Sequence, residues 1–347
     1  VPNIGAEHSD LGLAASHGGI ALGLRSALAG LTIADPGPVL VYDGLDADGN
    51  LTAIDYEARA ADYAHVGYNE PDTVLIAQLM GMRPQRISPG GAATPSNQYA
   101  IPNQRMTGHV VSMPLAFETP LRTGNLRDPN GPQVTFAYES FIDELATAAG
   151  RDPVEFRLRL LEAGEEDGLF RKARSIATMR AAAERFGWDA RPSPAPTASS
   201  SGPVVTGRGI AYTYRSGTIV AVIAEADVDR DTGKVFVKRL VCAHDCGLVI
   251  NPTGLSHTVE CGMLHGLSRA LWEEVQFDEE KVTSVDWATH PSMRHSDTPE
   301  SIDVVIVNGD PNPERQDLPP YGAGEASHKP VIAAIANAIH DATGVRL

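Results

Sequence analysis

The stretch Tyr321-Gly322-Ala323-Gly324-Glu325-Ala326-Ser327-His328-Lys329-Pro330 leads directly into an apolar segment at residues 331–339. This segment predicts a packed helix, and Pro330 suits its start because the N–H that proline lacks is not needed there. The glycines predict left-handed backbone angles and close approach to a ligand, with Glu325 beside the positive end of the helix. Spacing alone leaves two interpretations: a functional carboxylate, or a glycine turn with a solvated glutamate before a packed helix.

Composition limits the class of protein around this stretch. The chain has 347 residues, of which 42% are hydrophobic and 21% charged, which is typical of a globular protein with about two domains. Its net charge of −16 argues against nucleic-acid binding, since that requires basic patches. No apolar run approaches the ~20 residues of a membrane helix, so we expect no membrane insertion. The expected partners are small molecules and other proteins.

The compartment is harder to predict because the chain starts at Val1 rather than at Met. We expect an upstream segment to have been cut off, processed away or left out, and a localisation signal could have been lost with it. The three cysteines are too few for a disulfide framework and favour a reducing compartment only weakly. The expectation is a cytoplasmic protein, or a periplasmic one if an upstream signal was removed.

Hydrophobic periodicity predicts the order of strands and helices. Strands are expected at residues 39–43, 51–56, 105–113, 204–214, 218–228, 234–241 and 302–307, and helices at residues 20–28, 72–80, 133–149, 152–161, 169–186, 251–274 and 331–339. Turn-forming residues predict hairpins over residues 46–50 and 229–233, and Asp152 is predicted to cap the helix that it opens. The Pro- and Ser-rich segment 189–203 predicts an exposed linker.

Two motifs suggest chemistry that the sequence then argues against. Cys242-Ala-His244-Asp-Cys246 brings two thiols and an imidazole together, but structural zinc needs a second ligand pair and the remaining cysteine, Cys261, lies in a predicted helix. We therefore favour buried small residues at a strand end and predict no metal ligands. Gly322-x-Gly324-x-x-Ser327 is like a dinucleotide fingerprint, but no strand directly precedes it, which excludes a Rossmann site. Hydrolase and nucleotide-triphosphatase motifs do not occur.

Three ordered stretches resemble one known family. They are residues 120–139, Pro-Leu-Arg-Thr-Gly-Asn-Leu-Arg-Asp-Pro-Asn-Gly-Pro-Gln-Val-Thr-Phe-Ala-Tyr-Glu; residues 243–252, Ala-His-Asp-Cys-Gly-Leu-Val-Ile-Asn-Pro; and Gly322-Ala-Gly-Glu325 with the following helix and Asp-Ala-Thr-Gly-Val-Arg at 341–346. They resemble the molybdopterin-binding catalytic subunits of the xanthine oxidase family, in particular the branch like aldehyde dehydrogenase and the isoquinoline 1-oxidoreductase β-subunit. Residues 207–211 and 266–274 are similar to the same branch. The resemblance covers about residues 38–347 and corresponds to the C-terminal part of such a subunit.

The resemblance implies an α+β fold of the molybdenum-cofactor-binding domain type, with mixed sheets and packed helices. Residues 1–95 are then the remainder of the first molybdopterin-binding domain with an N-terminal segment, and residues 96–347 are the second such domain, with the linker 189–203 inside it. The implied cofactor is molybdopterin in its cytosine dinucleotide form with molybdenum. The implied partners are a subunit with 2Fe–2S clusters and another chain that supplies the first part of the molybdopterin subunit.

The same resemblance implies a role for Glu325. The family's glutamate at this position is the general base in a water-derived hydroxylation of an electron-poor carbon, as in an N-heterocycle or an aldehyde. The electrons then leave through the 2Fe–2S partner. The cofactor supplies the redox chemistry and the protein supplies orientation and electrostatics.

Further site residues are implied by position, although the pattern departs from the family in places. Arg127 matches an arginine near the family's active centre, Gln133 begins the helix beyond it, and Asp128 stands where glycine is commoner. In residues 257–266 the family usually has glutamine at Thr258 and His265 and glycine at Cys261. The expected cofactor contacts are Arg127, Gly322, Gly324, Thr258, Gly262 and His265.

Two alternatives stay open, and the departures in residues 257–266 support the first of them. One is a non-catalytic split or diverged subunit that completes or stabilises a partner's cofactor site. The other is an acidic binding protein without a cofactor, in which Glu325 has no reacting partner.

Overall fold

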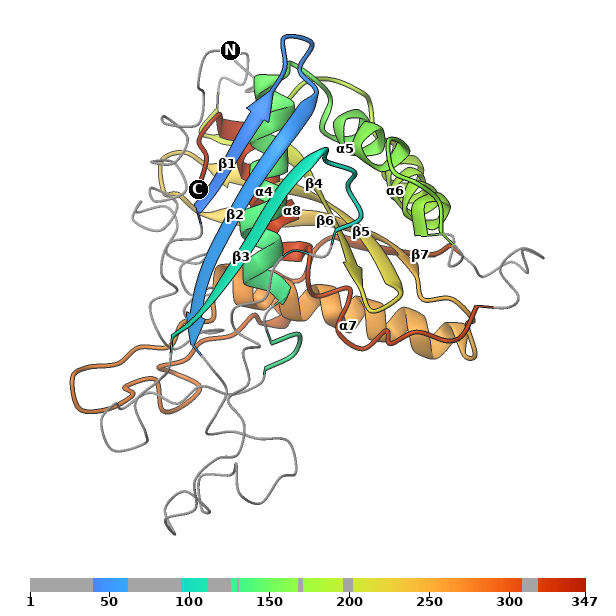
Figure 1. Cartoon of the computed structure of the whole chain (residues 1–347). Helices are drawn as coiled ribbons and strands as arrows, with labels where there is room; N and C mark the ends of the chain where they lie inside the picture. Colours follow the sequence, from blue (N-terminus) through green and yellow to red (C-terminus); the bar gives the residue numbers. More distant parts are fainter. Residues whose placement is uncertain are drawn as a thin grey trace, which may run out of the picture.

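Two mixed β-sheets and five α-helices form the described part of the chain in this computed structural model (Figure 1). The structure describes residues 40–61, 95, 97–111, 126–129, 131–167, 171–195, 202–307 and 318–347. The expected helices at 20–28 and 72–80 lie outside these ranges, as do residues 84–94, 112–125 and 308–317.

The smaller sheet has the order β1-β2-β3, formed by Leu40–Leu45, Leu51–Ala61 and Asn103–Val111. Strands β1 and β2 are antiparallel, so the predicted hairpin is confirmed, and β3 runs parallel to β2. Asp46 stabilises the turn because its Oδ1 accepts the N–H groups of Asp48 and Asn50, at 2.9 and 2.8 Å.

The larger sheet has the order β4-β5-β6-β7, formed by Val204–Arg215, Thr218–Asp229, Val235–Asp245 and Ser301–Ile306. Its first three strands are antiparallel and β7 pairs parallel to β6, and the hairpin predicted over residues 229–233 is confirmed between β5 and β6. Strand β6 continues beyond its predicted end at residue 241, because Cys242 to Asp245 remain paired with β5.

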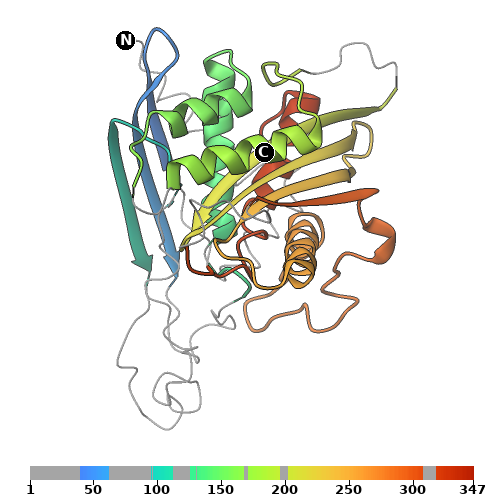
Figure 2. The ribbon, with the colours of Figure 1, turned by 90° about the vertical axis from the view of Figure 1, so that its right-hand side faces the viewer.

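Five helices accompany the sheets: α4 (Gly131–Ala148), α5 (Pro153–Glu162), α6 (Arg171–Phe186), α7 (Pro252–Leu271) and α8 (Val331–Thr343). The predicted N-cap of α5 is confirmed, since Asp152 Oδ1 accepts the N–H groups of Val154 and Glu155. Figure 2 shows α5 and α6 in light green in front of the larger sheet. None of the described helices is long and apolar enough to cross a membrane.

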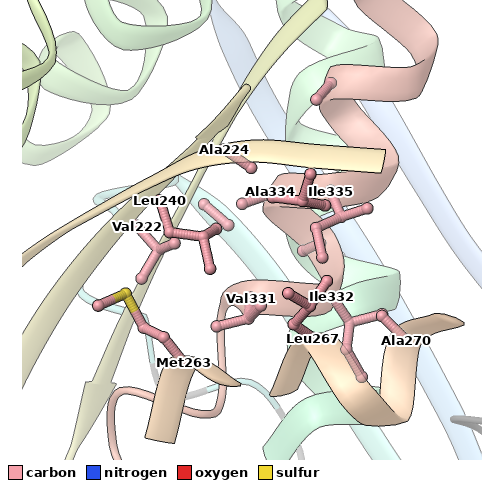
Figure 3. Packing of buried hydrophobic residues seen from close by; sticks show 14 of the residues in the cluster. Val222, Ala224, Leu240, Met263, Leu267, Ala270, Val331, Ile332, Ala334 and Ile335 are labelled. Carbon is pink, nitrogen blue, oxygen red and sulfur yellow. The ribbon is translucent and has the colours of Figure 1, made fainter. Parts of the chain in front are cut away.

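The larger sheet is buried on both faces. Val220, Val222 and Ala224 of β5 pack into a core with α7 and α8, and Figure 3 shows Val222 and Ala224 near Met263 and Ile335. The intervening residues of β5, Ile219, Ala221 and Ile223, pack into a second core with α4, α5 and α6. Because both faces are covered there, β5 is apolar from Ile219 to Ala224 and lacks the polar alternation of a half-exposed strand over these residues.

Helix α8 lies unusually close to β4 because β4 presents glycines to it. A Cβ atom on Gly207 would lie 2.3 Å from the carbonyl oxygen of Ala338, and one on Gly209 would lie 2.3 Å from that of Ala334. Apart from its last residue, Thr343, α8 is buried along its whole length. The two glycines therefore determine how deeply α8, and the Glu325 loop before it, can approach the sheet.

A buried carboxylate joins α4 to the other elements. Glu139 is fully buried and accepts hydrogen bonds from Arg157 Nε at 2.8 Å, the N–H of Tyr212 at 3.1 Å, Tyr99 Oη at 3.0 Å and Asn97 Nδ2 at 2.6 Å. Burial raises its pKa, and the Arg157 guanidinium opposes that shift.

The predicted exposed linker 189–203 is partly wrong. Arg191 pairs with the Asp341 carboxylate at 2.6 Å, and the buried Ser193 donates its Oγ hydrogen to the same carboxylate at 2.9 Å. The start of the segment is thus attached to α8 because Asp341 needs partners where it is buried. Residues 196–201 lie outside the described ranges, and the expected domain division between 95 and 96 stays a prediction.

We expect Gly209→Ala to destabilise the protein by roughly 1–3 kcal/mol, because the added methyl group meets the backbone of α8 rather than a movable side chain. Urea unfolding followed by circular dichroism measures this as a lower midpoint. Gly202→Ala is the matched control, because a Cβ atom there meets nothing within 4 Å and its φ is not left-handed, so we expect a change within about 0.5 kcal/mol. Equal midpoints for the two variants would contradict the prediction.

Candidate functional site

The loop Gly322–Glu325 lies just before α8, as predicted, with Pro330 immediately ahead of the helix. The predicted left-handed angles are wrong, since neither Gly322 nor Gly324 is among the glycines with positive φ. A Cβ atom at either position would meet no atom within 4 Å. Neither backbone strain nor packing among the described residues therefore requires glycine at these two positions.

Two side chains from distant elements hold the carbonyl groups of this loop. Thr218, the first residue of β5, donates its Oγ1 hydrogen to the carbonyl oxygen of Gly322 at 2.7 Å. Arg127, in the segment before α4, donates from Nε to the carbonyl oxygen of Gly324 at 2.7 Å. The loop is thus fixed from the larger sheet on one side and from the 126–129 segment on the other.

The Glu325 carboxylate is contacted at both of its oxygens. Oε1 accepts the main-chain N–H of Asp128 at 3.1 Å, and Oε2 forms an ion pair with Arg215 Nη2. The side chain is 36% exposed, so a substrate or solvent molecule can reach it. An oriented and accessible carboxylate has the features that a general base requires.

Arg127 also connects this loop to α7. Its Nη2 donates to the carbonyl oxygen of Thr258 at 3.3 Å, and its Nη1 lies 3.4 Å from Cys261 Sγ. The structure thereby brings Arg127, Thr258 and Gly324 together, as expected from the sequence. Their roles toward a cofactor stay predictions.

Gly262 and His265 lie on the same helix. A Cβ atom on Gly262 would lie 2.0 Å from Ser327 Oγ, so packing between α7 and the 324–330 turn accounts for this glycine without a cofactor. The His265 ring lies 5.1 Å from the His328 ring, centroid to centroid. Burial lowers the pKa of His265, and the cations of Arg269 and Arg127 lower it further, whereas the Glu273 carboxylate opposes that shift.

Sequence reasoning missed Arg269, which is buried in α7. Its Nη1 donates to the carbonyl oxygen of Arg127 at 2.9 Å and to His328 Nε2 at 3.2 Å, which places the His328 proton on Nδ1. Burial lowers the pKa of Arg269 to about 10 and that of His328 well below its usual range. The signal present in the sequence is Arg269 itself, a charged residue within the largely apolar run Gly-Leu-Ser-Arg-Ala-Leu-Trp at 266–272.

Asp128 and Lys329 add two buried charges near Glu325. Asp128 is 1% exposed and its Oδ1 accepts from Arg215 Nε at 2.9 Å. Burial raises its pKa, which Lys329 and Arg215 lower. Burial lowers the pKa of Lys329, and Asp128 opposes that shift. Carboxylates and cations thus alternate around the candidate base.

Gln133 in the first turn of α4 is also nearly buried. Its Nε2 donates to the carbonyl oxygen of Pro129 at 3.1 Å, while its Oε1 has no hydrogen-bond partner among the described residues. Asp128 Oδ2, His328 Nδ1 and Arg269 Nη2 are likewise buried without such a partner in the described ranges. Several polar atoms near the Glu325 loop are therefore left for contacts that this part of the chain does not supply.

The motif Cys242-Ala-His244-Asp-Cys246 is buried, as the preferred interpretation predicted. Cys242 and Cys246 belong to the core beneath α7 and α8, and burial lowers the pKa of His244 to about 4. In the ranges that the structure describes, no three His, Cys, Asp or Glu side chains converge as metal ligands.

Comparison with known proteins identifies relatives. Two family profiles, each described as a molybdopterin cofactor-binding domain, match residues 41–161 and 131–299. A nicotinate dehydrogenase subunit from Pseudomonas putida is 34% identical over 313 residues, which cover 87% of this chain and 24% of that protein. The β-subunit of isoquinoline 1-oxidoreductase from Brevundimonas diminuta is 31% identical over 229 residues, which cover 65% of this chain and 26% of that protein.

A solved structure shows the same fold. Quinoline 2-oxidoreductase from Pseudomonas putida 86 superposes with a TM-score of 0.67 at 13% identity, over 88% of this chain and 59% of that chain. The predicted α+β fold of the molybdenum-cofactor-binding type is thereby confirmed. The chain spans about a quarter of the length of the two curated relatives named above.

We expect Arg127→Ala to loosen the Glu325 loop, because the loss of a hydrogen bond from a charged donor costs about 1.5–3 kcal/mol. Hydrogen exchange measured by mass spectrometry should become roughly tenfold faster or more in peptides covering residues 321–328. Arg180→Ala is the control, because Arg180 pairs with Glu162 on the exposed side of α6 and should leave these peptides unchanged. Unaltered exchange in Arg127→Ala would show that this arginine does not hold the loop.

Proposed function

The chain belongs to the molybdopterin-binding subunits of the xanthine oxidase family, and from this membership we propose that it forms part of a molybdenum hydroxylase with Glu325 as general base. The reaction is a water-derived hydroxylation of an electron-poor carbon, in an N-heterocycle or an aldehyde. The electrons pass to a partner chain that carries 2Fe–2S clusters, and a further chain completes the cofactor site. Relatives named for nicotinate and isoquinoline support the N-heterocycle as substrate.

The residues present fit a pterin group. Gly322 and Gly324 carry no side chain where a Cβ atom would meet open space, which allows a flat ligand to approach the backbone. Three buried atoms have no hydrogen-bond partner in the part of the chain that the structure describes: Gln133 Oε1, Asp128 Oδ2 and His328 Nδ1. They offer two acceptors and a donor that match the polar edges of a pterin. We propose Arg127, Thr258, Gly322, Gly324 and His265 as the residues of this chain that hold the cofactor, in its cytosine dinucleotide form.

One observation carries the proposal: an exposed carboxylate is held at both oxygens on a loop that has room for a ligand. A bound molybdopterin cofactor would supply the redox centre that accepts an electron pair. Arg127 and Thr218 fix the loop, and the Asp128 N–H orients Glu325 Oε1. Glu325 takes up, at a carboxylate oxygen, the proton that the water-derived nucleophile loses.

The non-catalytic alternative is supported by a specific observation on α7. The His265 ring packs against His328 within this chain, and Thr258 and Cys261 stand where the family usually has other residues. In that case the protein completes or stabilises a partner's cofactor site without performing the chemistry.

Metal content and a Glu325→Gln variant separate the two functions. We expect stoichiometric molybdenum in the purified complex and a loss of kcat of roughly 10²–10⁴-fold or more in the variant, since glutamine cannot take up the proton. Glu225→Gln on β5 is the control, because that side chain pairs with Lys238 at 3.5 Å on the larger sheet. A complex without molybdenum, or an unaffected variant, would leave the non-catalytic function as the better one.

The two loop glycines allow a test of cofactor approach that is independent of turnover. We expect Gly322→Ala with Gly324→Ala to leave the free energy of unfolding unchanged or to raise it by about 0.4–1 kcal/mol, because neither methyl group meets another of the described residues. The molybdopterin content of the purified complex should nevertheless fall roughly tenfold, since the methyl groups occupy the approach to the backbone. Gly202→Ala should keep full content, and full content in the double variant would exclude this approach.

A further inference from the structure

We propose that Arg215 is a positioning residue for Glu325, and that the Asp128 carboxylate fixes Arg215 in the geometry this requires. The inference rests on the proposed function, because it assumes that Glu325 is the base. It adds Arg215 and the Asp128 carboxylate, to which the sequence motifs give no such role.

One guanidinium group bridges two carboxylates here. Arg215, the last residue of β4, donates from Nε to Asp128 Oδ1 at 2.9 Å and pairs through Nη2 with Glu325 Oε2. The planar fork of arginine fixes the angle between these two directions. Because Asp128 fixes the orientation of the guanidinium group, the position at which Nη2 meets Glu325 is defined as well.

Asp128 acts on Glu325 in two ways. Its main-chain N–H binds Oε1 directly at 3.1 Å, and its carboxylate acts on Oε2 through Arg215. Asp128 therefore positions both oxygens of the Glu325 carboxylate. It determines the plane of this carboxylate as well as its distance from the backbone.

The Asp128 carboxylate is present at a cost. The backbone of Asp128 has a φ of 53°, in the left-handed region, where glycine would be free of strain. The side chain is buried, and Oδ2 has no hydrogen-bond partner among the described residues. A Cβ atom on Gly131 would lie 1.8 Å from this oxygen, so α4 must begin with glycine to admit the carboxylate. Such costs are typical of groups retained for a task.

No other described cation replaces Arg215. Lys329 faces the same cluster, but its Nζ donates to the carbonyl oxygen of Tyr214 at 3.5 Å, and in the described ranges only Arg215 is within ion-pair distance of Glu325. When Glu325 takes up a proton and becomes neutral, Arg215 keeps Asp128 as its counter-ion. The cation is then never left unpaired, and Glu325 can change its charge without disturbing β4.

Kinetics of the assembled complex test the proposal. We expect Arg215→Ala to lower kcat roughly 10–100-fold with KM changed less than about threefold, because a misplaced base affects the chemical step more than binding. Arg215→Lys should recover part of kcat, since it restores the charge but not the fork. Asp128→Gly suits the φ of 53°, keeps the N–H group, and should lower kcat by a smaller factor without loss of thermal stability. Arg180→Ala is again the matched control.

A second measurement does not depend on turnover. Carbodiimide labelling of Glu325, followed by peptide mass spectrometry, should become several-fold faster in Arg215→Ala and Asp128→Gly, because the carboxylate is released from its partner. Unchanged kcat and labelling in Arg215→Ala and Arg215→Lys would overturn the proposal. If Glu325→Gln stays active, the proposed function itself fails; if it is inactive while Arg215→Ala is fully active, only the positioning role fails.

Discussion

The buried carboxylate of Glu139 is the constraint on which the rest of the structure depends. It joins α4 to α5 through Arg157, to β4 through the N–H of Tyr212, and to the segment before β3 through Tyr99. Removing one partner of such a buried pair costs roughly 3–5 kcal/mol, so α4 cannot shift against β4 without a large loss. The segment that contains Asp128 precedes α4, and Arg215 is the last residue of β4. The hydrogen bonds of Glu139 therefore fix the relative position of the two elements whose ends contact Glu325.

Helix α8 transmits the same constraint to the loop that carries the base. Asn337 donates from Nδ2 to the carbonyl oxygen of Ile210 at 2.9 Å, and Gly207 and Gly209 allow the helix to lie directly on the strand. The position of Glu325 is thus an outcome of backbone packing several residues away. Gly207, Gly209 and the buried Glu139 therefore contribute to the position of Glu325 although they do not contact it.

Helix caps and hairpin turns were predictable because a few neighbouring residues determine them. Contacts between residues far apart in the sequence were not predictable in this way. The Asp152 cap and the hairpin at Asp46 are encoded within a few residues, and so were found. Arg215 was missed because its approach to Glu325 depends on the register of β4 against β5 and on the seating of α8. The loop glycines lack the left-handed angles that were expected of them, and a Cβ atom at either would meet open space, so their role toward a ligand stays a prediction.

The turn between β4 and β5 has a consequence for how this scaffold can diversify. Ser216 and Gly217 have φ values of 48° and 95°, and a Cβ atom on Gly217 would meet the Tyr321 ring at 2.1 Å. Arg215 and Thr218 flank this turn and contact the two ends of one loop. Evolution can therefore exchange the charge beside the carboxylate at a hairpin tip while the core stays intact, but an inserted residue would separate the two contacts. We therefore expect related proteins to vary in residue type at this turn more readily than in its length.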